Sequence, residues 1–194
     1  MQTMSVDLTP QTTEVARVVA GVRDDQLTGP TPCTETSVAA LLDHLVGLTT
    51  AFRMAAEKTP LDGRPHADAA HLPADWRTRL PEQLDALAAA WRNPSAWEGM
   101  AEAGGVQMPA PVAAAVALNE VTVHGWDLAV ATGQQYRPDP AAVQACLEMV
   151  GPRSDPSQDP EGLFGPVVTV PDDAPAFDRL LGQTGRHPGW TPSG

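Results

Sequence analysis

The segment from Ala113 to Thr132 constrains the fold most, because it is a long apolar helix pattern that nevertheless carries Glu120 and His124. On an α-helix a separation of four residues places two side chains one turn apart on the same face, about 6 Å apart along the axis. A carboxylate and an imidazole on an apolar face are costly to bury unless each finds a partner. A metal ion is a partner that satisfies both, so the segment predicts a metal site within a helical core. The same face also carries Ala113, Val116, Ala117, Leu128 and Ala131.

A second helix pattern, from about Val38 to Glu57, supplies a third candidate ligand, His44. A single histidine on an apolar face is more often a hydrogen-bonded core residue, but Glu120 and His124 on another core helix change that balance. Two imidazoles and a carboxylate match the protein ligands of catalytic zinc, which leave a position for water or substrate. The same set serves non-haem iron, and nickel or manganese also fits. A bundle with three satisfied polar core residues and no metal stays open at this point.

Other polar residues are weaker candidates for the site. Asp127 follows His124 by three residues, and we interpret it as a partner that orients a ligand or as a surface charge rather than as a fourth ligand. His66 and His71 lie in a Pro- and Asp-rich stretch, residues 59–75, which is typical of a solvated loop. We therefore do not include these two histidines in the metal site.

The two cysteines show neither metal-ligand nor redox spacing. We interpret Cys33 and Cys146 as small apolar fillers, and their low number suits a reducing cytoplasm. Trp126, beside the ligand face, and Arg186, near the C-terminus, are candidates for a pocket wall or for anion steering. Packing or surface roles are the more ordinary interpretation of both.

The remaining sequence predicts an all-α fold, a helix bundle with additional short helices. Thr9 as the N-cap, just before the first turn, and Pro10 as the first helical residue predict a helix start, and a third helix pattern contains Pro81, which either kinks it or begins a new helix. The Gly104-Gly105 pair favours a short β-hairpin. We interpret residues 1–194 as one domain, with about 160–194 as a C-terminal extension packed on the bundle. The helix patterns besides the two above cover residues 9–22, 76–91, about 140–150 and a short segment around 177–181.

Composition excludes several partner classes. The chain of 194 residues has a formal net charge of −12, with 24 acidic and 12 basic side chains and no cationic cluster. Nucleic acids and anionic membranes reward clustered cations, so neither is expected as a partner. We find no signal peptide and no apolar run of the roughly 20 residues that a membrane span needs. We expect a soluble, cytoplasmic protein that is a monomer or a homodimer.

Two phrases carry a family resemblance: L-L-D-H-L-V-G at residues 41–47 and E-V-T-V-H-G-W-D-L-A-V-A-T-G at residues 120–133. They resemble the actinobacterial metal-binding proteins of the DinB-like superfamily, which are related to the N-terminal domain of mycothiol-dependent maleylpyruvate isomerase. The resemblance spans nearly the whole chain, including T-P-C ending at Cys33 and Q-T-G-R-H-P-G-W from residue 183 to residue 190. It implies a DinB-like four-helix bundle whose His44, Glu120 and His124 hold a divalent metal, with zinc favoured.

The chain also departs from the pattern that it resembles. Thr36 occupies a place where such proteins usually have a tryptophan, and the chain is too short for the second domain of the isomerase. Maleylpyruvate isomerisation itself is therefore not assigned.

The resemblance implies a function in which a small thiol such as mycothiol binds the metal, loses its proton and attacks a small electrophilic substrate. The reaction would be thiol transfer or thiol-assisted isomerisation. Two alternatives remain: a metal-hydroxide hydrolase, for which Asp43 or Asp127 is the candidate base, and a non-enzymatic metal-binding or sensing bundle.

Overall fold

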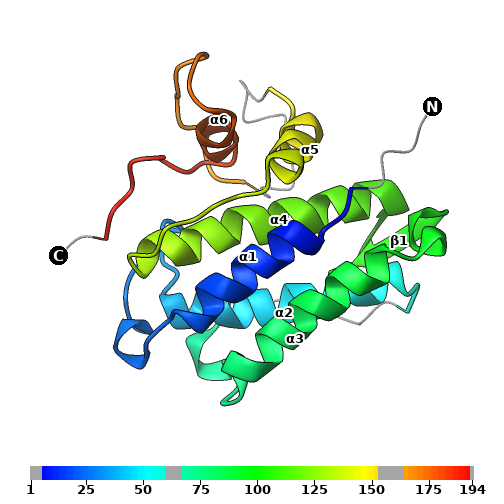
Figure 1. Ribbon diagram of the computed structural model, residues 1–194, viewed down its shortest axis with the longest axis horizontal. Coiled ribbons are helices and arrows are strands. Elements are labelled where there is room, and N and C mark those ends of the chain that lie inside the picture. The colour runs from blue at the N-terminus through cyan, green and yellow to red at the C-terminus, as the bar shows by residue number, and fades with distance from the viewer. Residues whose placement is uncertain (1–5, 60–66, 153–163, 193–194) are drawn as a thin grey trace.

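The computed structural model describes residues 6–59, 67–152 and 164–192. In these ranges the protein is a helical bundle with one two-stranded antiparallel sheet, as the sequence predicts (Figure 1). The α-helices are α1 (Thr9–Ala20), α2 (Val38–Ala56), α3 (Trp76–Trp91), α4 (Ala110–Ala131), α5 (Pro140–Val150) and α6 (Ala176–Gln183). The strands are β1 (Met100–Ala103) and β2 (Val106–Pro109), and the 3-10 helices are η1 (Asp24–Gln26), η2 (Ala69–His71) and η3 (Pro94–Trp97).

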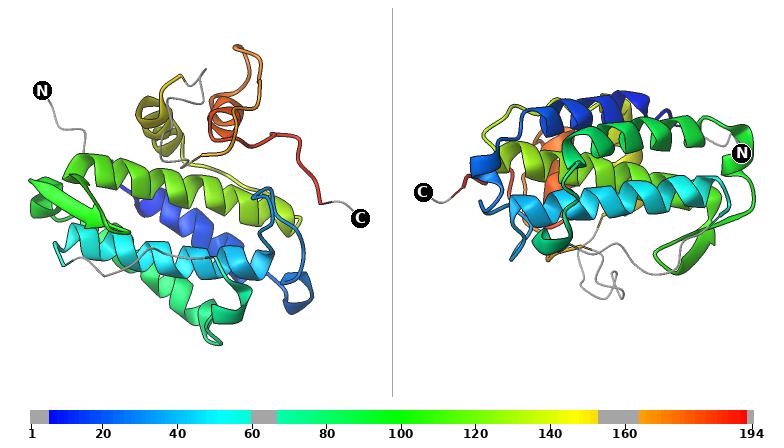
Figure 2. Two further views of the ribbon diagram at one scale, coloured as in Figure 1. Left: turned by 180° about the vertical axis from the view of Figure 1, so that it is seen from behind. Right: turned by 90° about the horizontal axis from the view of Figure 1, so that it is seen from below.

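The four long helices form the bundle. Helices α1 and α2 each pack against both α3 and α4, so the helices alternate around one shared core (Figure 2). Every one of them contributes fully buried aliphatic side chains to it, each worth about 1.5–3 kcal/mol relative to an exposed one. Examples are Val15, Leu45, Leu84 and Leu118.

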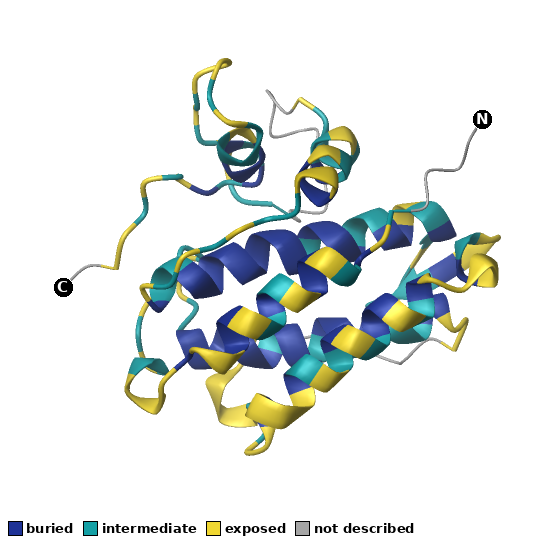
Figure 3. Cartoon of the chain, viewed as in Figure 1, coloured by how far each residue is buried: buried dark blue, intermediate teal, exposed yellow. Residues whose placement is uncertain are grey.

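Helix α4 lies between the other three helices of the bundle and a second layer. Helices α5 and α6 pack together on the side of α4 that faces away from α2 and α3 (Figures 1 and 2). Residues 121–129 of α4 are consequently all buried (Figure 3). The helix begins three residues before the predicted start, because Pro111 fits its first turn, where a backbone N–H is not needed. Two-sided burial explains why its sequence is apolar nearly all round.

Gly125 lets α1 and Tyr136 approach α4 closely. A Cβ atom at this position would lie 2.5 Å from Val15 Cγ2 and 2.6 Å from the Tyr136 hydroxyl oxygen, distances that real contacts do not show. The glycine is therefore required by the approach of α1 and Tyr136, although it lowers intrinsic helix propensity by about 1 kcal/mol relative to alanine.

We expect Gly125→Ala to destabilise the protein by about 1–3 kcal/mol, because overpacking outweighs the gain in helix propensity. Urea unfolding followed by circular dichroism measures the change. Adding Val15→Ala removes one of the two clashing groups and should recover part of the loss. A Gly125→Ala variant as stable as the parent would show that α1 moves away without cost.

Helix ends and the hairpin follow local chemistry. The Ser37 side chain accepts a hydrogen bond from the Ala40 backbone N–H, and Asp139 does the same for Ala142. The prediction that Thr9 precedes α1 is wrong by one residue, because Thr9 is already helical and its N–H donates to Asp7.

Helix α3 is continuous through Pro81, so the alternative of a new helix at that residue is also wrong. In the hairpin, Gly104 and Gly105 have φ values of 59° and 78°, as a two-residue turn with two left-handed positions requires.

Among the described residues one helix, α2, is long and apolar enough to cross a membrane, and 72% of its most apolar window is buried inside the bundle. A core helix of a globular protein has the same composition.

Candidate metal centre

The three predicted ligands meet between α2 and α4. His44 Nε2 and His124 Nε2 each lie 3.4 Å from the same oxygen, Oε2 of Glu120. The two imidazole rings are edge to face, with centroids 4.9 Å apart. One potential donor atom from each residue lies within 4.8 Å of the other two. The sequence expectation that these side chains share one place in the core is therefore met geometrically.

The donor set fits a divalent cation. Ligands held about 2.0–2.1 Å from a tetrahedral ion lie about 3.4 Å from one another, and both imidazole-to-carboxylate separations have this value. The cluster is not sealed, since the side chains of His44, Glu120 and His124 are 23%, 24% and 11% exposed. An ion bound by these three residues would keep a position that solvent or a small molecule can reach.

Burial and neighbouring charges shift the ionisation of the cluster. Burial opposes ionisation of Glu120, but hydrogen bonds with His124 and His44 hold the pKa of this carboxyl well below its usual range. Burial lowers the pKa of His124, yet the carboxylates of Asp127 and Glu120 raise that pKa to about 10. The two carboxylates thus favour the protonated, cationic ring, and a cation bound at Nε2 has to compete with that proton.

Asp127 contacts His124 on the side of the ring that faces away from Glu120. Its Oδ2 atom lies 2.9 Å from His124 Nδ1, the ring nitrogen that does not face Glu120. The carboxylate is fully buried, so the surface role considered for Asp127 is wrong, and its contact with His124 is the one that the orienting role requires. Such a partner fixes the tautomer and the direction of a histidine ligand.

Arg186 completes this network, and sequence reasoning missed it. Instead of lying at the surface, Arg186 is 8% exposed, and its Nη2 lies 3.0 Å from Asp127 Oδ2. Its Nη1 donates to the backbone carbonyl of Thr184 at 2.7 Å. The segment after α6 thus supplies the counter-charge of Asp127. Only the phrase at residues 183–190 pointed to this segment, since no local pattern pairs Arg186 with a residue of α4. Trp126 is buried, in agreement with a packing role.

Cys33 is not an apolar filler. It is half-buried, and Arg186 Nη2 donates to its Sγ atom at 3.4 Å. Potential donor atoms of Cys33, His124 and Asp127 also lie within 4.8 Å of one another. Because the Asp127 carboxylate is already paired with Arg186 and His124, we do not assign a second metal site there. Cys146 is fully buried, as a filler should be.

The two thiols should therefore differ in reactivity. Burial raises the pKa of the Cys146 thiol to about 12, so almost no thiolate exists at that site near neutral pH. We expect N-ethylmaleimide at pH 8 to label only Cys33 in the folded protein and both cysteines in guanidinium chloride. Intact-mass spectrometry counts the labels, and Cys33→Ser should leave the folded protein unlabelled. Labelling of Cys146 in the folded state would contradict the burial described above.

The other candidates from the sequence lie elsewhere. His66 is outside the described residues, and His71 is exposed in η2, with Nδ1 3.1 Å from Asp68. Asp43, a candidate general base, accepts a hydrogen bond from the Asp68 backbone N–H at 3.1 Å. Asp43 thus anchors the loop before α3.

Comparison with known proteins identifies the family of this chain. Residues 8–129 match the model of a family described as the mycothiol maleylpyruvate isomerase N-terminal domain. The chain belongs to this family. The matched part of the family domain contains all three candidate ligands and Asp127, whereas Arg186 lies beyond it.

Two relatives are the uncharacterized proteins Rv0738 and MT0763 from two strains of Mycobacterium tuberculosis. Each is 32% identical over 187 residues, covering 88% of this chain and 91% of the relative. No solved structure gives a significant match.

Proposed function

We propose that this protein is a divalent-metal-dependent enzyme that activates a low-molecular-weight thiol of the mycothiol type. The activated thiol is transferred to a small electrophilic substrate or promotes its isomerisation. The observation that supports this most is the accessible cluster of His44, Glu120 and His124, spaced as ligands of one ion in a chain of a mycothiol-linked family. Zinc suits this donor set best, and nickel, iron or manganese can replace it.

A divalent cation bound there would lower the pKa of a coordinated thiol, which makes a thiolate available at neutral pH. The residues of the chain prepare this chemistry. Glu120 supplies the negative charge, and Asp127 holds His124 with Nε2 directed toward Glu120. Arg186 balances the buried Asp127 charge, so the ring position is fixed before any ligand arrives. Neither cysteine belongs to the three-residue cluster, so the nucleophile in this proposal comes from the small thiol.

Hydrolysis by metal-bound water is the weaker alternative, because it needs a free general base beside the ion. Both carboxylates that the sequence offered are engaged. Asp43 accepts a hydrogen bond from the following loop, and Asp127 pairs with Arg186 and His124. The thiol reaction does not need such a base once the thiol is coordinated.

Cobalt substitution tests the proposal. The protein is purified without a histidine tag, stripped of metal, loaded with Co²⁺ and titrated with mycothiol. We expect a sulfur-to-cobalt charge-transfer band in the near ultraviolet, and S-methyl mycothiol, which has no ionisable thiol, should not produce it. Cobalt binding without a band would contradict thiol activation and leave hydrolysis or metal sensing. Failure to bind cobalt would contradict the metal centre itself.

A further inference from the structure

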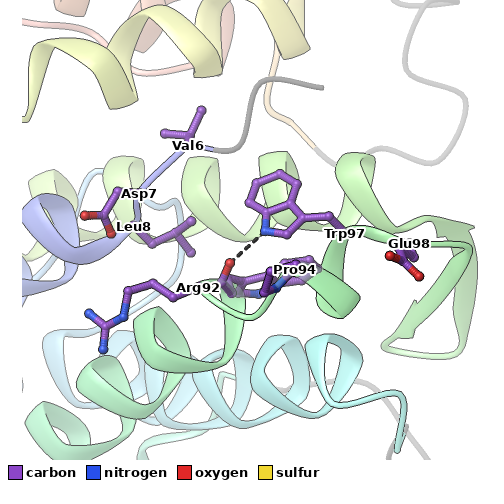
Figure 4. A pocket seen from close by; sticks show the side chains of 8 residues that line it. Val6, Asp7, Leu8, Arg92, Pro94, Trp97 and Glu98 are labelled. Atoms are coloured by element: carbon purple, nitrogen blue, oxygen red, sulfur yellow. Dashed lines mark hydrogen bonds between the residues drawn. The ribbon is translucent and has the colours of Figure 1, made fainter. Parts of the chain in front are cut away.

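A hollow lies at the end of the bundle where α1 begins and α3 ends (Figure 4). Its volume is about 570 Å³, within the usual range for a small-molecule site. It shares no lining residue with the candidate metal centre. The lining residues are Val6, Asp7, Leu8, Trp91, Arg92, Pro94, Trp97 and Glu98.

One wall of the hollow contains an unsatisfied hydrogen-bond donor. Trp91 is 2% exposed, and its indole N–H has no partner among the described residues. Trp97 packs edge to face against it, at 5.5 Å between ring centroids, and donates its own indole N–H to the Trp91 carbonyl at 2.7 Å. A buried donor without an acceptor costs about 1–3 kcal/mol. Of the two rings, only Trp97 is exposed enough for a ligand in the hollow to contact.

The rim of the hollow carries charges of both signs. Arg92 is exposed, and the hydrogen bond from its Nη1 to Thr9 Oγ1 at 3.1 Å uses only one of its N–H groups. Hydrogen bonds from Thr9 hold the pKa of Asp7 below its usual range, so this carboxylate is ionised at neutral pH. Glu98 is a second exposed carboxylate on the rim. A ligand that carries both an anionic and a cationic group complements these charges better than a simple anion or cation does.

An apolar cleft of about 450 Å³ adjoins the hollow, and the two have Val6, Leu8 and Trp97 as common lining residues. Its far side is formed by apolar side chains of α4 and α5, including Val112, Leu118 and Met149. An apolar group attached to the charged end of a ligand can therefore lie against Trp97 and extend into this cleft.

We propose that the hollow binds an α-amino acid zwitterion with a large apolar side chain. Its carboxylate pairs with Arg92, and its ammonium group faces Asp7, at the same end of the hollow (Figure 4). Its side chain packs on Trp97 and enters the apolar cleft. This site is independent of the metal chemistry proposed above, because the two share no residues.

Isothermal titration calorimetry with L-phenylalanine tests the site. Two analogues each lack one charge: 3-phenylpropionate has no ammonium group, and 2-phenylethylamine has no carboxylate. We expect saturable binding of L-phenylalanine and at least about tenfold weaker binding of both analogues. No heat of binding up to about 10 mM L-phenylalanine would overturn the proposal. Equal binding of either analogue would overturn the zwitterion assignment.

Variants show where the amino acid binds. Arg92→Gln should weaken L-phenylalanine binding by about tenfold or more, whereas Arg79→Gln, at an exposed arginine within α3, should not change it. Asp7→Asn should also weaken L-phenylalanine binding, because it removes the carboxylate that faces the ammonium group. Full affinity in Arg92→Gln would overturn the site. Glu120→Gln should bind L-phenylalanine normally, so failure of the metal proposal leaves this result unaffected.

Discussion

Replacing Glu120 with glutamine is expected to weaken divalent-cation binding by more than about 100-fold. The change removes the only carboxylate of the cluster and the charge that both imidazoles face at 3.4 Å, while the side-chain size is nearly conserved. Loss of a partner that only orients a ligand already costs about 10–100-fold in affinity, so loss of a ligand should exceed that range. Competition with a chromophoric chelator measures the dissociation constants of Zn²⁺ and Co²⁺.

Glu82→Gln is the matched control, because Glu82 is an exposed glutamate on α3, away from the cluster. It changes the net charge by the same amount and should leave cation affinity unaltered. Equal affinities of the Glu120 and Glu82 variants would remove Glu120 from the ligand set. The account of the site would then reduce to a polar cluster within a helical core.

The largest effect on stability is expected from Arg186→Ala. The guanidinium pairs with Asp127, which is fully buried, and its removal leaves that carboxylate without its cation. Breaking a buried ion pair by removing one partner costs about 3–5 kcal/mol. For a chain of this size each kcal/mol lowers the midpoint of thermal unfolding by about 2–4 °C, so a decrease of roughly 6–20 °C follows. Thermal scans followed by circular dichroism measure it.

Arg179→Ala provides the comparison, since Arg179 is an exposed arginine on α6 shortly before Arg186. It should shift the unfolding midpoint little. Combining Arg186→Ala with Asp127→Asn removes the uncompensated charge and should restore part of the stability. If Arg186→Ala unfolds at the same temperature as Arg179→Ala, the ion pair contributes nothing and the C-terminal segment is only loosely attached.

The features that could be predicted from the sequence are those that depend on residues close together along the chain. Apolar periodicity located the long helices, and Gly104-Gly105 indicated the hairpin. The spacing of four residues between Glu120 and His124 was enough to place both on one helix face. The position of His44 beside them required only that α2 and α4 be neighbours, which a four-helix bundle makes common.

The parts that sequence reasoning missed depend on contacts between distant segments. Arg186 pairs with a residue 59 positions earlier, and it reaches Cys33 across 153 positions. Neither pairing has a local pattern, because an arginine in a polar, Gly-rich segment looks like any surface residue. The hollow beside Trp91 is formed where the start of α1, the end of α3 and η3 converge, so no single stretch of sequence indicates it.

The counter-charge supplied from beyond α6 has a practical consequence for anyone who trims this chain. A fragment ending after α4 would keep every candidate ligand. It would lack α5 and α6, which leaves one face of α4 exposed, and it would leave the Asp127 carboxylate without its cation. Such a fragment is expected to aggregate or to lose the alignment of His124. The part matched by the family model, residues 8–129, is therefore shorter than the smallest piece that should fold and hold its site in shape.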